Sequence, residues 1–70
     1  MDIKTIKVEG MTCNHCKMNV ERSILNLEGI ETAVADPDRS EVVLEGEGID
    51  LEKIKLAVES IGYDYKGIKN

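Results

Sequence analysis

Two stretches of this chain repeat apolar residues at helical spacing, and the residues between them follow the pattern of strands. The first stretch covers about residues 14–27 and precedes Gly29, a residue type that often terminates helices. The second follows Asp50, a good N-cap, and ends at Gly62. The repeating positions are Cys16 or Lys17, Val20, Ile24 and Leu27, and then Leu51, Ile54, Val58 and Ile61. We therefore expect two amphipathic helices.

Four short runs rich in β-branched residues predict strands. They cover residues 3–8, 30–36, 40–45 and 63–68, and the middle two are separated by a turn at Pro37. The order of elements is then strand, helix, strand, strand, helix, strand. Because each helix must bury one face, this order favours an α+β fold with a four-stranded antiparallel sheet and both helices on one side.

Length and charge limit the number of domains and the kinds of partner that this chain can have. At 70 residues the chain has room for one domain, which we expect to span residues 1–70. A net charge of −5 disfavours binding to nucleic acid or to an anionic membrane. No apolar run exceeds the three residues of Val42-Val43-Leu44, so neither a bilayer span nor a signal-peptide core is expected. We expect an intact chain, from Met1 to Asn70, in the cytoplasm.

Cys13 and Cys16 lie between the first strand and the first helix. Unpaired N–H groups and the positive dipole end at a helix start favour the thiolate over the thiol. In the reducing cytosol such a pair indicates a metal or redox site rather than a structural disulfide. Lys17 follows directly, and its ammonium would offset the charge of a bis-thiolate complex.

The number and softness of the ligands decide which metal fits. A structural zinc site or an iron–sulfur cluster normally needs four ligands, and outside this loop the chain has no other Cys or His. Two soft thiolates suit Cu(I) first, followed by Hg(II), Ag(I) or Cd(II). A third thiolate can attack such an under-coordinated ion, so this site suits a carrier.

The loop resembles the motif of the heavy-metal-associated domain family, and the resemblance covers essentially the whole chain. It includes Leu27-Glu28-Gly29-Ile30 and Ile61-Gly62-Tyr63-Asp64 as well as the loop itself, Gly10-Met11-Thr12-Cys13-Asn14-His15-Cys16. The resemblance implies a ferredoxin-like fold and Cu(I) bound by Cys13 and Cys16. It further implies a small bacterial copper chaperone, with Met11 as an apolar tether for the loop and Tyr63 near the metal.

Five residues are expected to support the metal without binding it: Met11, Thr12, His15, Lys17 and Tyr63. A thioether is a weak ligand beside two thiolates, so Met11 is interpreted as packing. His15 should point away from the sulfurs, where it can tune the loop or contact a partner. Tyr63 follows Gly62, and this placement favours a shielding role near the metal, with plain core packing as the alternative.

Other residues near these positions have simpler interpretations. Met18 is expected to be exposed or partly packed, and Tyr65 to be structural. The acidic tract from Glu41 to Glu52 is interpreted as a solvated face, with selection of a basic docking surface as the alternative.

Several functions remain open. The first is a copper chaperone that delivers Cu(I) to the metal-binding domain of a copper-transporting P-type ATPase, with a copper-responsive repressor as a further partner. The second is such an ATPase domain itself, and the third is a mercury carrier. A dithiol oxidoreductase is the enzymatic alternative, which the short chain and the absence of an evident base disfavour, so we expect no enzyme. An exposed two-thiolate site also suggests a copper-bridged homodimer.

Overall fold

Six elements follow one another in the order that the sequence predicts. The computed structural model describes residues 2–12 and 14–69. The elements are β1 (Asp2–Glu9), α1 (Asn14–Leu25), β2 (Ile30–Asp36), β3 (Glu41–Gly46), α2 (Leu51–Ser60) and β4 (Asp64–Ile68). Each predicted strand and helix is therefore present, with ends that differ by at most two residues.

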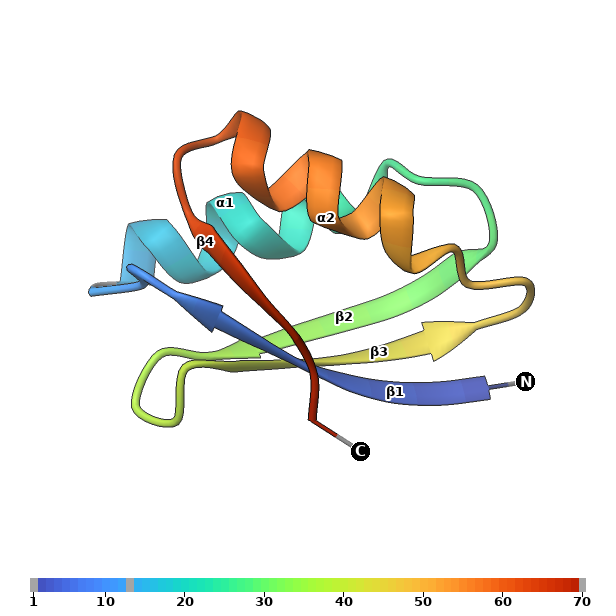
Figure 1. The fold of residues 1–70 in the computed structure, drawn as a ribbon, viewed down its shortest axis with the longest axis horizontal. Coiled ribbons are helices and arrows are strands. Elements are labelled where there is room, and N and C mark those ends of the chain that lie inside the picture. The colour runs from blue at the N-terminus through green and yellow to red at the C-terminus, as the bar shows by residue number, and fades with distance from the viewer. Residues whose placement is uncertain (1, 13, 70) are drawn as a thin grey trace.

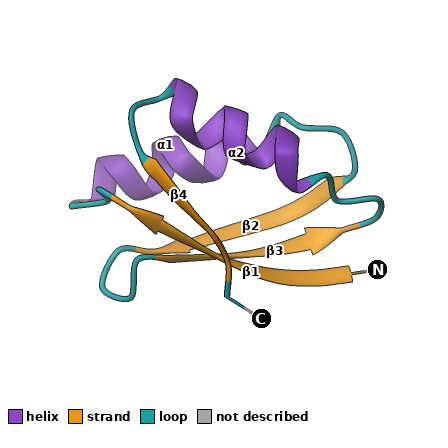
Figure 2. Cartoon of the chain, viewed as in Figure 1, coloured by secondary structure: helices purple, strands orange, loops and turns teal. Residues whose placement is uncertain are grey.

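The four strands form one antiparallel sheet in the order β2-β3-β1-β4. Figure 1 shows both helices on the same face of this sheet, and Figure 2 shows the resulting two layers by element type. The predicted ferredoxin-like arrangement of four antiparallel strands under two helices is confirmed.

The core lies between the sheet and the helices. Side chains alternate across a strand, so every second residue of β1 and β3 faces this layer. Ile6 and Val8 do so from β1, and Val42 and Leu44 from β3, all with no exposed surface. The remaining buried apolar residues are Met11, Val20, Ile24, Ala33, Ala35, Ile54 and Val58. The core is thus built almost entirely from aliphatic side chains.

The end of α1 differs from the prediction. The helix ends at Leu25, two residues early, and the Leu27 N–H donates to the Ile24 carbonyl in a tighter turn (3.0 Å). Gly29 adopts a φ of 87° and lies four residues beyond the helix, where its carbonyl accepts from the Glu47 N–H (2.8 Å). Gly29 therefore shapes the connection to β2 and does not cap α1.

Both ends of α2 follow the prediction. The Asp50 side chain accepts from the Glu52 N–H at the start of the helix (3.0 Å). At the other end Gly62 has a φ of 91°, and the Tyr63 N–H donates to the Val58 carbonyl (3.3 Å). This turn directs the chain from α2 into β4.

Two expectations about burial are wrong. The helical spacing predicts Ile61 in the core, but it is the C-cap residue of α2 and is 38% exposed. The acidic tract predicts Glu41 on a solvated face, yet it is only 8% exposed. Glu41 projects from the helix-free face of β3, where the Lys69 ammonium forms an ion pair with it. The pairing explains how a carboxylate is buried there.

Candidate metal centre

The loop between β1 and α1 is anchored by a buried methionine. Gly10 leaves β1 with a φ of 103°, a conformation that favours glycine. Met11 follows with 5% of its surface exposed and packs into the core, whereas Thr12 is exposed. The apolar side chain therefore fixes the loop to the body of the protein, while the next residue faces solvent.

Cys16 lies in the first turn of α1. Its side chain is half-buried and packs against the core, and its Sγ lies 4.0 Å from Oγ1 of Thr12. The first turn of a helix presents N–H groups without helical partners, which favour a thiolate. Cys13, the other predicted ligand, lies outside the described residues.

The other side chains at the start of α1 have different environments. His15 is exposed, and Lys17 is half-buried. Met18 is 54% exposed, in agreement with its predicted position at the surface. The imidazole and the thioether are thus open to solvent, whereas part of the Lys17 side chain packs against the protein.

Tyr63 lies against Gly10, at the start of the loop, although the two residues are far apart in the sequence. It is half-buried and packs against the core. A Cβ added to Gly10 would lie only 3.1 Å from Cδ1 of Tyr63, so the ring lies directly against the backbone that enters the loop. The structure therefore brings Tyr63 to the loop, and Gly10 permits this close approach.

Sequence reasoning missed a cleft next to this loop. Its lining includes Thr12, Asn14 and Lys17 from the loop and α1, together with residues 34–38 from β2 and the following turn. The sequence marks Pro37 only as a turn residue. The antiparallel strand order could have indicated this cleft. Because β3 runs antiparallel to both β1 and β2, the turn between β2 and β3 must lie at the end of the sheet where β1 finishes.

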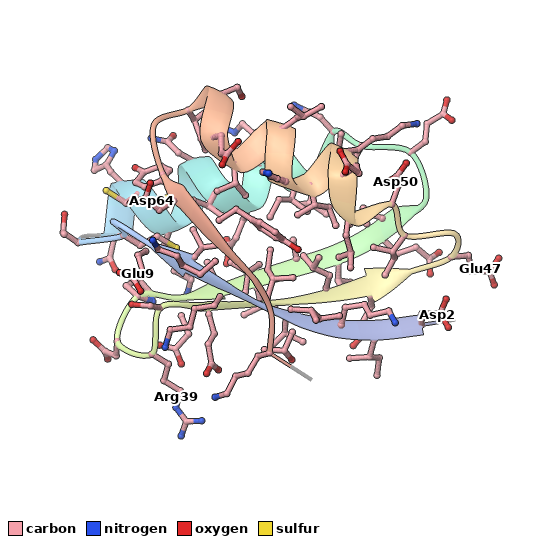
Figure 3. All side chains as sticks on the ribbon, in the orientation of Figure 1. Asp2, Glu9, Arg39, Glu47, Asp50 and Asp64 are labelled. Atoms are coloured by element: carbon pink, nitrogen blue, oxygen red, sulfur yellow. The ribbon has the colours of Figure 1, made fainter. Side chains whose placement is uncertain are left out.

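Charged residues of both signs gather at this end of the molecule. Glu9 and Asp64 are direct register partners in β1 and β4, and Figure 3 shows both near the start of α1. Figure 3 also shows Arg39 at the tip of the β2–β3 turn at the same end, whereas Asp2 and Glu47 lie at the other. The loop therefore opens onto a surface of mixed charge.

The described part of the chain contains no ready-made cluster of metal ligands. Across residues 2–12 and 14–69, no three His, Cys, Asp or Glu side chains form a group able to hold a metal ion. Cys16, a free cysteine, carries the thiol in this part of the loop. In the same residues, no helix has the length and apolar character needed to cross a membrane.

Comparison with known proteins adds a family relationship. The heavy-metal-associated domain model matches residues 5–64. The copper chaperone CopZ of Staphylococcus epidermidis strain RP62A is 40% identical over 68 residues, which cover 94% of this chain and all of that protein. The CopZ of Staphylococcus haemolyticus is 38% identical over 65 residues, covering 90% and 96% of the two chains.

Solved structures agree with these sequence relationships. A structure described as the CopZ metallochaperone superposes with a TM-score of 0.87 at 30% identity and covers 91% of this chain and 98% of its own. The Cu(I)-loaded N-terminal domain of a potential copper-translocating P-type ATPase from Bacillus subtilis gives 0.81 at 26% identity, covering 97% and 90%.

Proposed function

Because this chain belongs to the heavy-metal-associated domain family, we propose that it is a copper chaperone of the cytoplasm. It binds Cu(I) through the thiolates of Cys13 and Cys16 and delivers it to a copper-transporting P-type ATPase. The observation that carries this proposal is a Cys-x-x-Cys loop, anchored by Met11 at the start of α1, in a chain 38–40% identical to proteins named copper chaperone CopZ.

The choice of copper in the +1 state follows from the donors. Cu(I) is soft and accepts two thiolates without further ligands, whereas zinc prefers four. The half-buried Cys16 lies where helix N–H groups stabilise negative charge. Lys17 adds a positive charge one residue later, which offsets part of the net negative charge of a bis-thiolate complex.

Transfer proceeds by ligand exchange. A thiolate of the partner's own Cys-x-x-Cys loop attacks the bound Cu(I), and each thiolate of this chain leaves in turn, so the ion is never released to water. Thr12 and His15 are exposed beside the site and leave it open to such an attack. Met11 and Tyr63 hold the loop in place, and the process needs no catalytic acid or base.

A second candidate function is that of a metal-binding domain within a copper ATPase. It is favoured by the 26% identity to the Bacillus subtilis ATPase domain, which this chain covers almost completely. An immunoblot of the native organism separates the two functions. A band near 7.8 kDa supports the chaperone, and a band of several times that mass supports the ATPase domain.

The metal site is tested by anaerobic titration of the reduced protein with Cu(I) against a competing chelator, with Zn(II) and Hg(II) as comparisons. Cys13→Ser/Cys16→Ser is expected to weaken Cu(I) binding by roughly a hundredfold or more, because both soft donors are lost. Met18→Ser is the matched control, since it removes an exposed sulfur from the same helix.

Circular dichroism should show that the double variant keeps its fold, because Cys16 is only half-buried and lies outside the aliphatic core. Cu(I) binding that survives in the folded double variant would contradict the proposal. Preferential retention of Hg(II) over Cu(I) by the natural protein would instead favour a mercury carrier.

A further inference from the structure

The strand β4 forms one edge of the sheet. In the order β2-β3-β1-β4 it has a strand beside it on one side only, where it pairs with β1. Figure 1 shows β4 in front of β1, at the side of the sheet that faces the viewer. The open side of an edge strand presents backbone N–H and C=O groups with which another strand can pair. β4 is therefore a surface on which a further strand can be added.

The backbone groups of Tyr65 point out from this edge. The Val8 N–H donates to the Ser40 carbonyl (2.8 Å), so the backbone of Val8 faces the β3 side of β1 and not β4. Val8 lies opposite Tyr65 in the register of β1 and β4. When two opposite residues of an antiparallel pair do not bond to each other, both turn their N–H and C=O groups away from the pair. The Tyr65 N–H and C=O are consequently directed outward from the sheet.

Charged residues of opposite sign flank Tyr65. Asp64 and Lys66 are both exposed, and neither forms an ion pair with another residue in the ranges 2–12 and 14–69. Asp64 lies opposite Glu9 of β1, and Figure 3 labels both side chains at this end of the molecule. Like charges in such a position destabilise a strand pair. A cation on the open side of β4 would relieve this repulsion.

We propose that β4 pairs in antiparallel orientation with β4 of a second copy of this chain, about a two-fold axis between the two Tyr65 residues. In this register the outward N–H of each Tyr65 donates to the C=O of the other. Asp64 of each copy then lies opposite Lys66 of the other copy. The contact uses no metal ion, so it is separate from the copper-bridged homodimer that the sequence suggests.

The charges favour a second copy as the occupant. Centring the pair on Tyr65 forms two Asp64–Lys66 contacts at once. Centring it on either neighbouring residue would place two carboxylates or two ammonium groups opposite each other. The two Tyr65 rings also become cross-strand neighbours on the same face of the extended sheet, and aromatic pairs of this kind are favourable. The sequence of β4 is thus complementary to itself in this one register.

Two features limit the assembly to a dimer. The register of β1 and β4 shifts between Lys7 and Val8, and Gly67 has a φ of 105°, so regular pairing along β4 is short. On the opposite edge of the sheet, the Ala35 N–H of β2 already donates to Oε2 of Glu21 (2.8 Å), which hinders the addition of a strand there. We therefore expect a closed, symmetric and reversible dimer held by a small contact.

Sedimentation equilibrium tests for the dimer. The protein is the variant Cys13→Ser/Cys16→Ser, which copper cannot bridge, and the reduced, metal-free natural protein is measured in parallel. Both are expected to dimerise reversibly at concentrations up to about 1 mM, as a small contact requires. A monomer throughout this range in both proteins would overturn the proposal. The result does not depend on which metal the loop binds, so it stands apart from the proposed function.

Charge reversal tests the register. Asp64→Lys and Lys66→Asp are each expected to weaken dimerisation by about tenfold, because two attractive pairs become two repulsive ones. An equimolar mixture of these two variants should regain the natural affinity as a heterodimer, since each reversed charge then faces its opposite. Glu59→Lys and Lys55→Asp, at exposed positions of α2, are controls that change the net charge equally and should have little effect. A mixture that associates no better than its components would overturn the proposed register.

Hydrogen exchange locates the contact. Exchange of the outward Tyr65 amide should slow as the protein concentration rises. The Asp64 amide faces β1, so its exchange should not change with concentration and it serves as the internal control. A dimer in which Tyr65 shows no concentration-dependent protection would have its interface elsewhere and would overturn the proposal.

Discussion

Gly46 lies where the end of β3 meets the connection after α1. It is buried, and a Cβ added to it would collide with the carbonyl oxygen of Gly29 and approach Cα of Ile30 to 2.9 Å. These are backbone atoms, which cannot move aside as a flexible side chain can. Only glycine allows β2 and β3 to pair up to this point.

Gly46→Ala is therefore expected to destabilise the fold by about 2–3 kcal/mol, in the range for overpacking of a close contact. Gly48→Ala is the control. Gly48 has a φ of 64°, but a Cβ added to it would meet nothing within 4 Å, so only backbone strain of roughly 1 kcal/mol applies. Urea unfolding measures both, and a smaller loss for Gly46→Ala than for Gly48→Ala would contradict the steric explanation.

Tyr65 is a half-buried residue of β4. Burial raises the pKa of its phenol above 10.0, because the charged form loses solvation. Above pH 10 the unfolded chain then ionises this phenol more readily than the folded protein does. Folding stability is consequently lost as the pH rises through this range.

Tyr65→Phe should remove this part of the alkaline destabilisation. Urea unfolding at pH 8 and at pH 11 measures the loss, and the loss is expected to be smaller in the variant than in the natural protein. The two proteins share all their other side chains, so the difference isolates Tyr65. The same loss in both proteins would show that the phenol does not contribute.

At the scale of elements, α1 protects an edge of the sheet. β2 is an edge strand, and the Ala35 N–H points away from β3 and donates to Oε2 of Glu21 on α1 (2.8 Å). An unpaired edge is a template for pairing with another chain. The Glu21 carboxylate thus binds a backbone N–H with which a strand of another molecule would otherwise pair.

Glu21→Ala is expected to cost about 1 kcal/mol, because a hydrogen bond to a charged group is lost at a partly buried site. Glu59→Ala, at an exposed position of α2, should change stability by less than about 0.5 kcal/mol. Hydrogen exchange of the Ala35 amide provides a local measurement. Unchanged protection of this amide in Glu21→Ala would contradict the edge-capping role.

At the scale of the whole molecule, the C-terminal residues hold the sheet from its helix-free side. The Lys69 N–H donates to the Thr5 carbonyl (2.7 Å), and the Lys69 ammonium pairs with the buried Glu41 of β3. The contact spans β1, which lies between β4 and β3. The end of the chain therefore links three strands.

Lys69→Met is expected to destabilise the protein by about 1 kcal/mol, since it leaves the Glu41 carboxylate buried without its cation. In a Glu41→Gln background the same substitution should cost less than half as much, because no charge is left unpaired. Lys66→Met, on the exposed part of β4, is the control. Additive costs in the double-mutant cycle would show that the pair is not coupled.

Much of the fold follows from local sequence. The spacing of Val20 and Ile24, and of Ile54 and Val58, determines two helices with one apolar face each. Gly62 and Asp50 determine the ends of α2, since a left-handed cap and an N-cap depend only on neighbouring residues. Local sequence likewise determines that the Cys-x-x-Cys loop lies between a strand and a helix.

Other features depend on residues far apart in the chain, and only the tertiary structure decided them. The Tyr63 ring against Gly10, the burial of Glu41 by Lys69, and the cleft between Lys17 and Asp38 each join different elements. Local propensity contains no information about these distances, because sheet register and helix packing set them. The sequence alone thus determined the elements and the ligand loop, and the tertiary structure decided what surrounds that loop.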